Sequence, residues 1–308
     1  MRISERLSSM CVKSLIQSMD TQIMCMLAKQ VIPGYDIHRQ TGIPEGLAVS
    51  NRHVARQIVS DMIAGDHFPE FVALLIEMQD TGLMGRKYPV FFIDDVVRGM
   101  YELGFLYDRE NRMFIDNPAF RYTRNWGALR NGIEYIVSFL RIDIVGNSEL
   151  VRRHSAEIAQ KTYENLRSIV YTASNKRNGR IWSWEGDGGL VAFFFSNKHL
   201  LAALSAMEII HELYIYNLTQ NILDKPLQVR IAVHSGPFDY TENEEELTRS
   251  DTVKRVMEIE SNHTKPDTIT ISPVVKVMLD EFVVRKFKPT EAKAHSEFFY
   301  YRLGWENI

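Results

Sequence analysis

Residues 134–236 contain an ordered series of strand and helix patterns that restricts the fold more than any other part of the chain. The run EYIVSFLRIDI predicts a strand, and a long helix with Ser148 as its N-cap follows it. The stretch IWSWEGDGGLVAFF predicts a hairpin with a tight turn, and a second helix and the strand LQVRIAVHSG complete the series. This β-α-β-β-α-β order predicts an α+β, ferredoxin-like fold, in which a twisted sheet carries its helices on one face.

The pattern changes near residue 130, and this change predicts two domains. With 308 residues, of which 45% are hydrophobic and 24% charged, the chain is long enough for both. We expect an N-terminal, mainly helical regulatory domain over residues 1–130 and the ferredoxin-like domain over residues 131–308.

The N-terminal domain is predicted to consist of helices followed by a hairpin. Residues 3–30 predict one amphipathic helix, and Ser50 is the expected cap of a second. Two more helices are expected in PEFVALLIEMQD and in the segment that Gly104 ends, before two short apolar runs around DRENR. This order is similar to that of a winged helix, a fold that binds DNA or proteins. Three arginines near the hairpin do not make a DNA-binding face, so we expect nucleic acid not to be a partner.

Charge and hydropathy argue against several other classes. The net charge of −3 and the absence of a basic block give no general attraction to nucleic acid or membrane. No apolar run approaches the roughly 20 residues of a membrane span, and the N-terminus lacks the apolar centre of a signal peptide. We therefore expect a cytoplasmic protein without a membrane partner, in which Cys11 and Cys25 are reduced, structural thiols.

Two carboxylates are predicted to meet at one end of the sheet. Asp143 lies where the first strand ends, Asp187 lies in the turn of the hairpin, and the topology places that strand beside the hairpin. With the backbone carbonyl of Ile144, they would form a site for one or two Mg²⁺ or Mn²⁺ ions. N–H groups at the start of the next helix are expected to bind phosphate, and the residues there are Gly146, Asn147 and Ser148. The expected ligand is a metal-bound triphosphate, although each motif alone is also typical of a turn or a helix cap.

Four motifs together resemble the class III nucleotide cyclases, the adenylate and guanylate cyclase family, over roughly residues 134–303. They are FLRIDIVGNSEL, WEGDGGLVAFF, VRIAVHSG and SDTVKRVMEIES, in the order in which the family has them. The family carries its first metal-binding Asp in a D-I-x-G segment and its second in a G-D hairpin. The resemblance therefore implies that Asp143 and Asp187 bind two metal ions and that Ile144 adds its carbonyl.

The same resemblance implies further contacts to the nucleotide. Arg230 would contact the outer phosphates, and Lys286 and Lys288 are looser candidates for the family's phosphate-binding Lys. His234 matches the family's His in the RIAVHSG strand. We interpret it as a structural residue, because a His beside a strand end is more often part of the framework than an acid or base.

Two departures from the family lie in SDTVKRVMEIES. Lys254 replaces the family's transition-state Asn, and Glu258 replaces its transition-state Arg. A carboxylate there would repel charge that develops on the α-phosphate, whereas Lys254 and the neighbouring Arg255 would supply positive charge. The alternative is that Lys254 and Glu258 form an exposed i, i+4 ion pair worth a few tenths of a kcal/mol.

A third departure concerns the nucleobase. The family's base-selecting Lys or Glu falls at Ser183, and Leu247 or a neighbour replaces its base-contacting Asp. We expect Ser183 to contact the base, on the strand face opposite to Trp182 and Trp184. A site without either purine signature is similar to the pyrimidine cyclases of Pycsar antiphage systems, which make cyclic UMP or cyclic CMP.

These expectations lead to two hypotheses of different classes. In the first, the protein is a homodimeric nucleotide cyclase whose active sites lie across the subunit interface. Its expected substrate is UTP, with CTP as the next choice, and an unorthodox adenylate or guanylate cyclase is the variant of this hypothesis. In the second, Lys254 and Glu258 mark a degenerate cyclase fold that senses a nucleotide or only dimerises. Paired metal carboxylates favour the enzyme.

Overall fold

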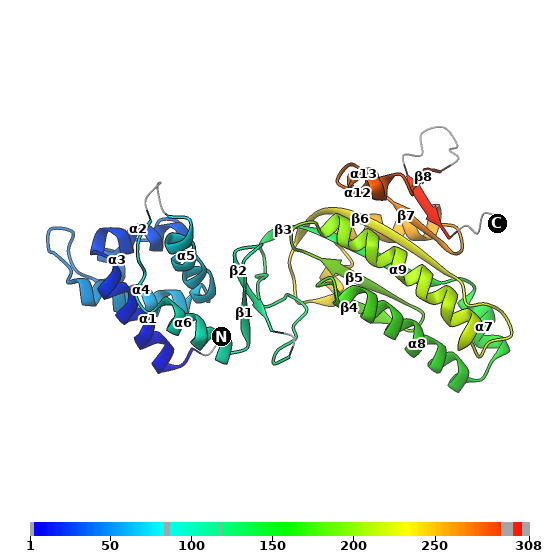
Figure 1. Cartoon of the computed structure of the whole chain (residues 1–308), viewed down its shortest axis with the longest axis horizontal. Helices are drawn as coiled ribbons and strands as arrows, with labels where there is room; N and C mark the ends of the chain where they lie inside the picture. Colours follow the sequence, from blue (N-terminus) through cyan, green and yellow to red (C-terminus); the bar gives the residue numbers. More distant parts are fainter. Residues whose placement is uncertain (1–2, 83–86, 118, 291–297, 304–308) are drawn as a thin grey trace. The chain divides into compact units, whose positions relative to one another are not determined.

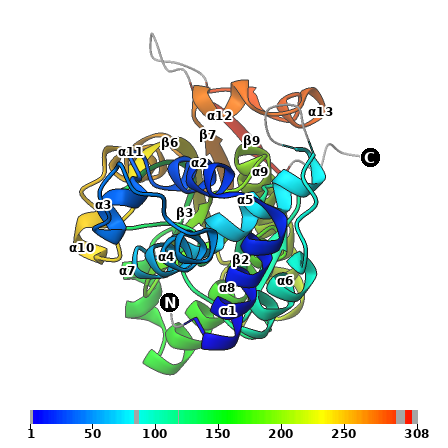
Figure 2. The ribbon, with the colours of Figure 1, turned by 90° about the vertical axis from the view of Figure 1, so that its left-hand side faces the viewer.

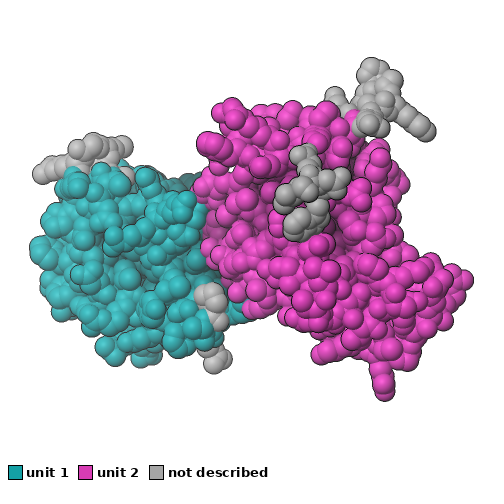
Figure 3. Space-filling model, turned by 45° about the vertical axis from the view of Figure 1, so that its right-hand side comes forward, with its two compact units in different colours: residues 1–128 teal, residues 129–308 magenta. Residues whose placement is uncertain are grey.

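The structure is a computed structural model, and it describes residues 3–82, 87–117, 119–290 and 298–303. The chain divides into two compact units, Met1–Ala128 and Leu129–Ile308 (Figure 3). In the described residues, no helix combines the length and the hydrophobicity that a membrane span requires.

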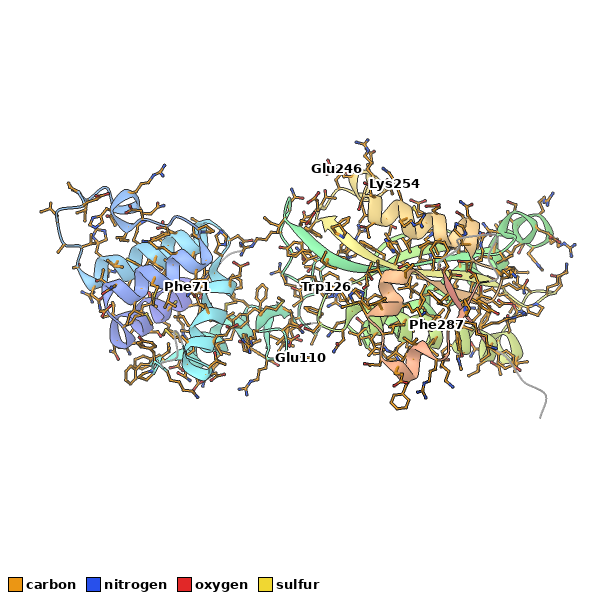
Figure 4. All side chains as sticks on the ribbon, turned by 90° about the horizontal axis from the view of Figure 1, so that it is seen from above. Phe71, Glu110, Trp126, Glu246, Lys254 and Phe287 are labelled. Atoms are coloured by element: carbon orange, nitrogen blue, oxygen red, sulfur yellow. The ribbon has the colours of Figure 1, made fainter. Side chains whose placement is uncertain are left out.

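Unit 1 is built from helices that share one apolar core (Figures 1 and 2). Phe71, one of the large side chains in this core, is fully buried (Figure 4). The helices are α1 (Glu5–Ser18), α2 (Thr21–Val31), α3 (Ile37–Thr41), α4 (Asn51–Ala64), α5 (Phe68–Asp80) and α6 (Ile93–Glu102).

The single helix predicted over residues 3–30 is wrong. Met19 is extended, with φ −155° and ψ 160°, and the side chain of Asp20 accepts the N–H of Ile23 to begin α2. An Asp side chain caps a helix more readily than it continues one, so the chain breaks here although the apolar spacing runs through the break. In contrast, Ser50 caps α4 as predicted, by accepting the N–H of His53.

A two-stranded antiparallel sheet follows the helices of unit 1. It pairs β1 (Phe105–Asp108) with β2 (Met113–Asp116). The Asp108 carboxylate accepts the N–H groups of Glu110 and Asn111, which fixes the turn in the DRENR segment. Helices and hairpin therefore occur in the predicted order, and the winged-helix interpretation of that order stays a prediction.

Unit 2 is an α+β structure around one central sheet, as predicted. The sheet has the order β4-β5-β3-β6-β7-β9-β8, in which only β6 and β7 pair in parallel. Its strands are β3 (Glu134–Ile144), β4 (Arg180–Glu185), β5 (Gly188–Phe193), β6 (Val229–Asp239), β7 (Thr268–Ile271), β8 (Lys288–Pro289) and β9 (Phe299–Arg302).

Two long helices, α8 (Ala156–Asn175) and α9 (Lys198–Thr219), cover one face of this sheet (Figure 1). The short helix α7 (Asn147–Arg153) precedes α8, so the single long helix predicted from Ser148 is wrong. His154 is extended, and Ser155 accepts the N–H of Ile158 as the N-cap of a new helix. The remaining helices are α10 (Glu244–Leu247), α11 (Asp251–Glu258), a π-helical turn (Ile259–His263), α12 (Pro273–Val277) and α13 (Glu281–Val284).

Alternation along β3 separates the two faces of the sheet. Leu140, Ile142 and Ile144 lie in the core with α8 and α9, together with Phe287 from the C-terminal region (Figure 4). The opposite face carries an aromatic cluster of Phe139, Trp182, Phe238 and Tyr240. We call this second face the open face, and it contains the candidate site.

Candidate active site

The end of β3, which carries Asp143, lies beside the β4–β5 turn that carries Asp187. Asp143 pairs in register with Gly188 of β5 on one side and with Arg230 of β6 on the other. The next residue, Ile144, donates its N–H to the backbone carbonyl of Asp187 at 3.1 Å. The half-buried Asp187 in the β4–β5 turn is therefore fixed beside the end of β3.

The two glycines beside Asp187 are needed for different reasons. Gly186 has φ +49°, a left-handed conformation, and a Cβ there would meet nothing within 4 Å. A Cβ on Gly188 would lie 2.5 Å from the carbonyl of Ile142 and 3.1 Å from Oδ1 of Asp143. Backbone conformation therefore favours glycine at Gly186, whereas close packing against β3 requires it at Gly188.

Asp143 belongs to a network of four charged side chains. Its Oδ2 accepts a hydrogen bond from Nη2 of Arg230 at 2.7 Å, and its Oδ1 lies 3.7 Å from Nη2 of Arg141. Nε of Arg230 lies 2.7 Å from Oε1 of Glu260, whose side chain is only 6% exposed. Burial raises the pKa of Glu260, although the Arg230 guanidinium opposes the shift.

Sequence reasoning missed Arg141 and Glu260. The available signal for Arg141 was a cation in the middle of the otherwise apolar run FLRIDI. Glu260 lies in the π-helical turn, two residues beyond the α-helical residues of α11, and no motif spacing identified it.

The donors at this end of the sheet fit a metal that is held jointly with phosphate. In the described part of the chain, no group of three or more His, Cys, Asp or Glu side chains is placed to hold a metal by itself. Mg²⁺ commonly takes one or two carboxylates and completes its shell with water and substrate phosphates. Asp143, Asp187 and the carbonyl of Ile144 match that donor set.

The turn that was predicted to bind phosphate, residues 146–148, has a different local structure from the one expected. Gly146 is left-handed, with φ +70°, and begins α7, while Ser148 lies inside α7 rather than capping a long helix. The side chain of Asn147 accepts a hydrogen bond from the Tyr163 hydroxyl at 2.6 Å, which ties it to α8. Ser148 is exposed. Contact between these residues and phosphate stays a prediction.

A β-bulge changes the expected orientation of the residues around Ser183. The β4–β5 register shifts between Ile181 and Ser183, so Trp182 joins the aromatic cluster of the open face while Trp184 packs against the helix-side core. The prediction that both tryptophans point the same way is therefore wrong. Ser183 pairs with Leu190, which itself pairs with Arg141, so Ser183 lies on the open face.

Helix α11 carries the predicted catalytic cations on the open face, at a distance from Asp143. Thr252 packs on Gly236, where a Cβ would lie 2.6 Å from its Oγ1, and His234 lies close to Arg255. His234 is four residues along β6 from Arg230, about 13 Å away. Within one chain, α11 therefore does not bring Lys254 or Arg255 to the metal carboxylates.

The charged side chains of α11 do not form the predicted i, i+4 pair between Lys254 and Glu258. Lys254, 60% exposed and labelled in Figure 4, lies 3.5 Å from Asp251, and Arg255 binds Glu258 at 2.7 Å. These i, i+3 pairs replace the predicted Lys254–Glu258 pair. The Arg255 guanidinium also lies 5.3 Å from the ring centre of Phe298.

His234 has the surroundings of a framework residue. Its Nδ1 is hydrogen-bonded to the hydroxyl of Ser272 at 2.8 Å. Burial, and then the nearby Arg255, lower its pKa to about 4, so the imidazole is neutral at physiological pH.

The looser lysine candidates are not brought to Asp143 in one chain. Lys288 begins β8, an edge strand that three strands separate from β3, so it lies about 19 Å away across the sheet. Lys286 is exposed in the turn before β8. Leu247, at the position of the family's base-contacting Asp, is buried at the end of α10.

The sequence matches no protein-family model and no curated protein. Solved structures of cyclase domains are similar to part of the chain. The monomeric guanylyl cyclase domain of the RhoGC fusion protein from the aquatic fungus Blastocladiella emersonii has 19% identity and a TM-score of 0.47, covering 57% of this chain and 99% of that one. The guanylate cyclase domain of RhGC from Catenaria anguillulae, in complex with GTP, has 19% identity and a TM-score of 0.44, covering 55% and 96%. The adenylyl cyclase CyaB from P. aeruginosa has 18% identity and a TM-score of 0.44, covering 55% and 92%.

Proposed function

We propose that residues 131–308 form a class III nucleotide cyclase domain, which converts an NTP into a 3′,5′-cyclic nucleotide and pyrophosphate. The observation that carries this proposal is the position of Asp143 at the end of β3, directly beside the β4–β5 turn that contains Asp187. Two carboxylates in such a place are typical of metal-assisted phosphoryl chemistry.

In the proposed reaction, the 3′-hydroxyl of the ribose attacks the α-phosphate and pyrophosphate leaves. Two Mn²⁺ or Mg²⁺ ions, when bound, lower the pKa of the attacking hydroxyl and neutralise phosphate charge. Asp143, Asp187 and the carbonyl of Ile144 hold the ions, and Arg230 contacts the outer phosphates. Glu260 keeps the Arg230 guanidinium in position through their 2.7 Å contact.

A homodimer with active sites across the subunit interface is part of the proposal. The candidate residues of one chain fall into two groups on the open face: those at the end of β3, and Lys254 and Arg255 on α11, about 13 Å along β6. A second copy that faces the first would place its α11 opposite the metal carboxylates. Isologous contacts of this kind are the commonest arrangement in homodimers.

The base is proposed to be uracil, with cytosine as the next choice. Ser183 lies on the open face at the base-selecting position and is neither the Lys nor the Glu of the purine cyclases. The pyrimidine assignment links the protein to Pycsar antiphage defence, with unit 1 as the regulatory part. An unorthodox adenylate or guanylate cyclase is the alternative within the same reaction.

The second candidate function is a degenerate domain that senses a nucleotide or only dimerises. Its supporting observation is that Lys254 and Arg255 are both paired on the surface, with Asp251 and Glu258.

Purified Asp143→Asn and Asp187→Asn proteins separate the two functions. The enzyme proposal predicts that both variants fold, bind Mn²⁺ at least tenfold more weakly and lose cyclisation, because each loses a charged ligand. Unchanged activity in either variant would show that the site is elsewhere.

A further inference from the structure

Arg141 is a cation at the centre of the open face that the proposed mechanism does not use. It lies on β3 between Leu190 and Ala232, in the same side-chain row as Asp143, and is 19% exposed. Its Nε is buried, and in the described part of the chain that atom has no hydrogen-bond partner. Among the residues that the structure describes, the ion pair of Arg141 is the 3.7 Å contact between Nη2 and Oδ1 of Asp143.

The two arginines at Asp143 differ in how many carboxylates they contact and at what distance. Arg230 is held by two carboxylates, each at 2.7 Å, whereas Arg141 has only the longer contact with Asp143. A metal ion on Asp143 would compete for both carboxylate oxygens, Oδ2 with Arg230 and Oδ1 with Arg141. Arg230 would keep its 2.7 Å contact with Glu260, whereas the largely buried Arg141 would keep only a longer-range attraction to that carboxylate, which is unfavourable.

We propose that Arg141 binds the triphosphate of the nucleotide when metal occupies Asp143; this inference rests on the proposed function. Nε and Nη2 form one edge of the guanidinium, and such an edge binds two oxygens of a phosphate side by side. The triphosphate would supply the negative charge that Arg141 loses when a metal ion binds the Asp143 carboxylate. Arg141 thereby provides, from its own strand, a phosphate-binding cation in a chain that has Glu258 where the family has an Arg.

The register of the sheet favours phosphate over base as the group that Arg141 contacts. Asp143 lies two residues along the same strand, about 7 Å away, while Ser183 lies two strands away, about 10 Å across the sheet. Gly188, beside the turn that contains Asp187, also lies close to this guanidinium, because a Cβ there would be 3.2 Å from Nη2 of Arg141. Loss of Arg141 should therefore weaken the binding of all four nucleotides by the same factor.

Two binding measurements on full-length Arg141→Met protein test the proposal. In Mn²⁺ titrations without nucleotide, followed by electron paramagnetic resonance, the variant should bind Mn²⁺ about three- to tenfold more tightly, because a competing cation is gone. In calorimetric titrations with the α,β-methylene analogues of ATP, GTP, CTP and UTP plus Mn²⁺, it should bind each analogue at least about tenfold more weakly. A residue that only supports the fold would not move the two affinities in opposite directions.

Two further variants serve as controls. Arg167→Met removes the same charge from an exposed position on α8, on the helix-covered face, and should change neither affinity. Arg141→Lys keeps the charge without the planar edge, so it should leave Mn²⁺ binding near wild type and weaken analogue binding several-fold. If Arg141→Met fails to fold, the Lys variant alone decides.

Analogue binding that is unchanged in both Arg141 variants would overturn the inference, as would a loss confined to one base. Its failure can be told from failure of the proposed function. If wild-type protein makes no cyclic product but binds Mn²⁺ and analogue in a manner that depends on Arg141, the proposed function fails and the Arg141 contact stands. If cyclisation occurs and the Arg141 variants bind normally, the opposite holds.

Discussion

Substitution of Gly188 by Ala should disturb the packing between β5 and β3 and thereby the candidate site. The new Cβ would lie 2.5 Å from the carbonyl of Ile142, a backbone atom that cannot rotate away, and 3.1 Å from Oδ1 of Asp143. Gly186→Ala is the matched control, two residues away in the same turn. Its Cβ meets nothing within 4 Å, so it changes only the cost of the positive φ.

The expected magnitudes follow from these contacts. Overpacking of this kind costs about 1–3 kcal/mol, and we expect the upper part of that range because the nearest atom is backbone. The left-handed φ of Gly186 costs an Ala about 1 kcal/mol. For a unit of this size each kcal/mol lowers Tm by about 2–4 °C, so Gly188→Ala should lose about 5–10 °C and Gly186→Ala about 2–4 °C.

Differential scanning calorimetry measures both shifts, and Mn²⁺ titration measures the effect on the site. Gly188→Ala should bind Mn²⁺ at least about tenfold more weakly, because its methyl group would displace the end of β3 and the Asp143 carboxylate. Gly186→Ala should bind it normally. Equal Tm values for the two variants, together with wild-type Mn²⁺ affinity in Gly188→Ala, would refute the packing argument.

Three further predictions address the base, the assembly and the framework. Ser183→Ala should alter the order of preference among NTPs more than the Mn²⁺ requirement, because a lost base contact acts on discrimination; the reverse result would show that Ser183 does not contact the base. Mixing Asp187→Ala with Arg255→Ala protein should restore up to one working site per mixed dimer, and no recovery after verified subunit exchange would argue for complete sites in each chain. The pKa of His234 is lowered to about 4, so the unfolded state binds its proton first as the pH falls and stability decreases below about pH 6.5. Wild-type protein should lose about 2 kcal/mol from this group between pH 7 and pH 5, a loss that is absent in a folded His234→Gln variant; parallel pH profiles would contradict the assignment.

The order of elements could be predicted from sequence because local patterns determine it. β-branched runs, caps such as Ser50 and the glycines near Asp187 give signals within a few residues of each element. The pairing of β3 with the hairpin, which brings Asp143 beside the turn, then follows from topology. Helix breaks at Asp20 and Ser155 were missed because the apolar spacing continues through each capping residue.

The remaining features of the site depend on contacts between distant segments. The bulge between Ile181 and Ser183 separates Trp182 from Trp184, and strict alternation does not reveal it. Arg141 and Glu260 are 119 positions apart and join one charge network only because β6 brings Arg230 between Asp143 and the π-helical turn. No local pattern encodes such a network.

The most direct test of the central claim is product formation by the purified full-length protein. It is incubated with Mn²⁺ and each of ATP, GTP, CTP and UTP in turn, and the products are identified by mass spectrometry against 3′,5′-cyclic standards. We expect a cyclic nucleotide and one equivalent of pyrophosphate from at least one NTP, with UTP first, and no cyclic product from Asp143→Asn protein. Folded, Mn²⁺-binding protein that makes no cyclic product from any of the four would contradict it.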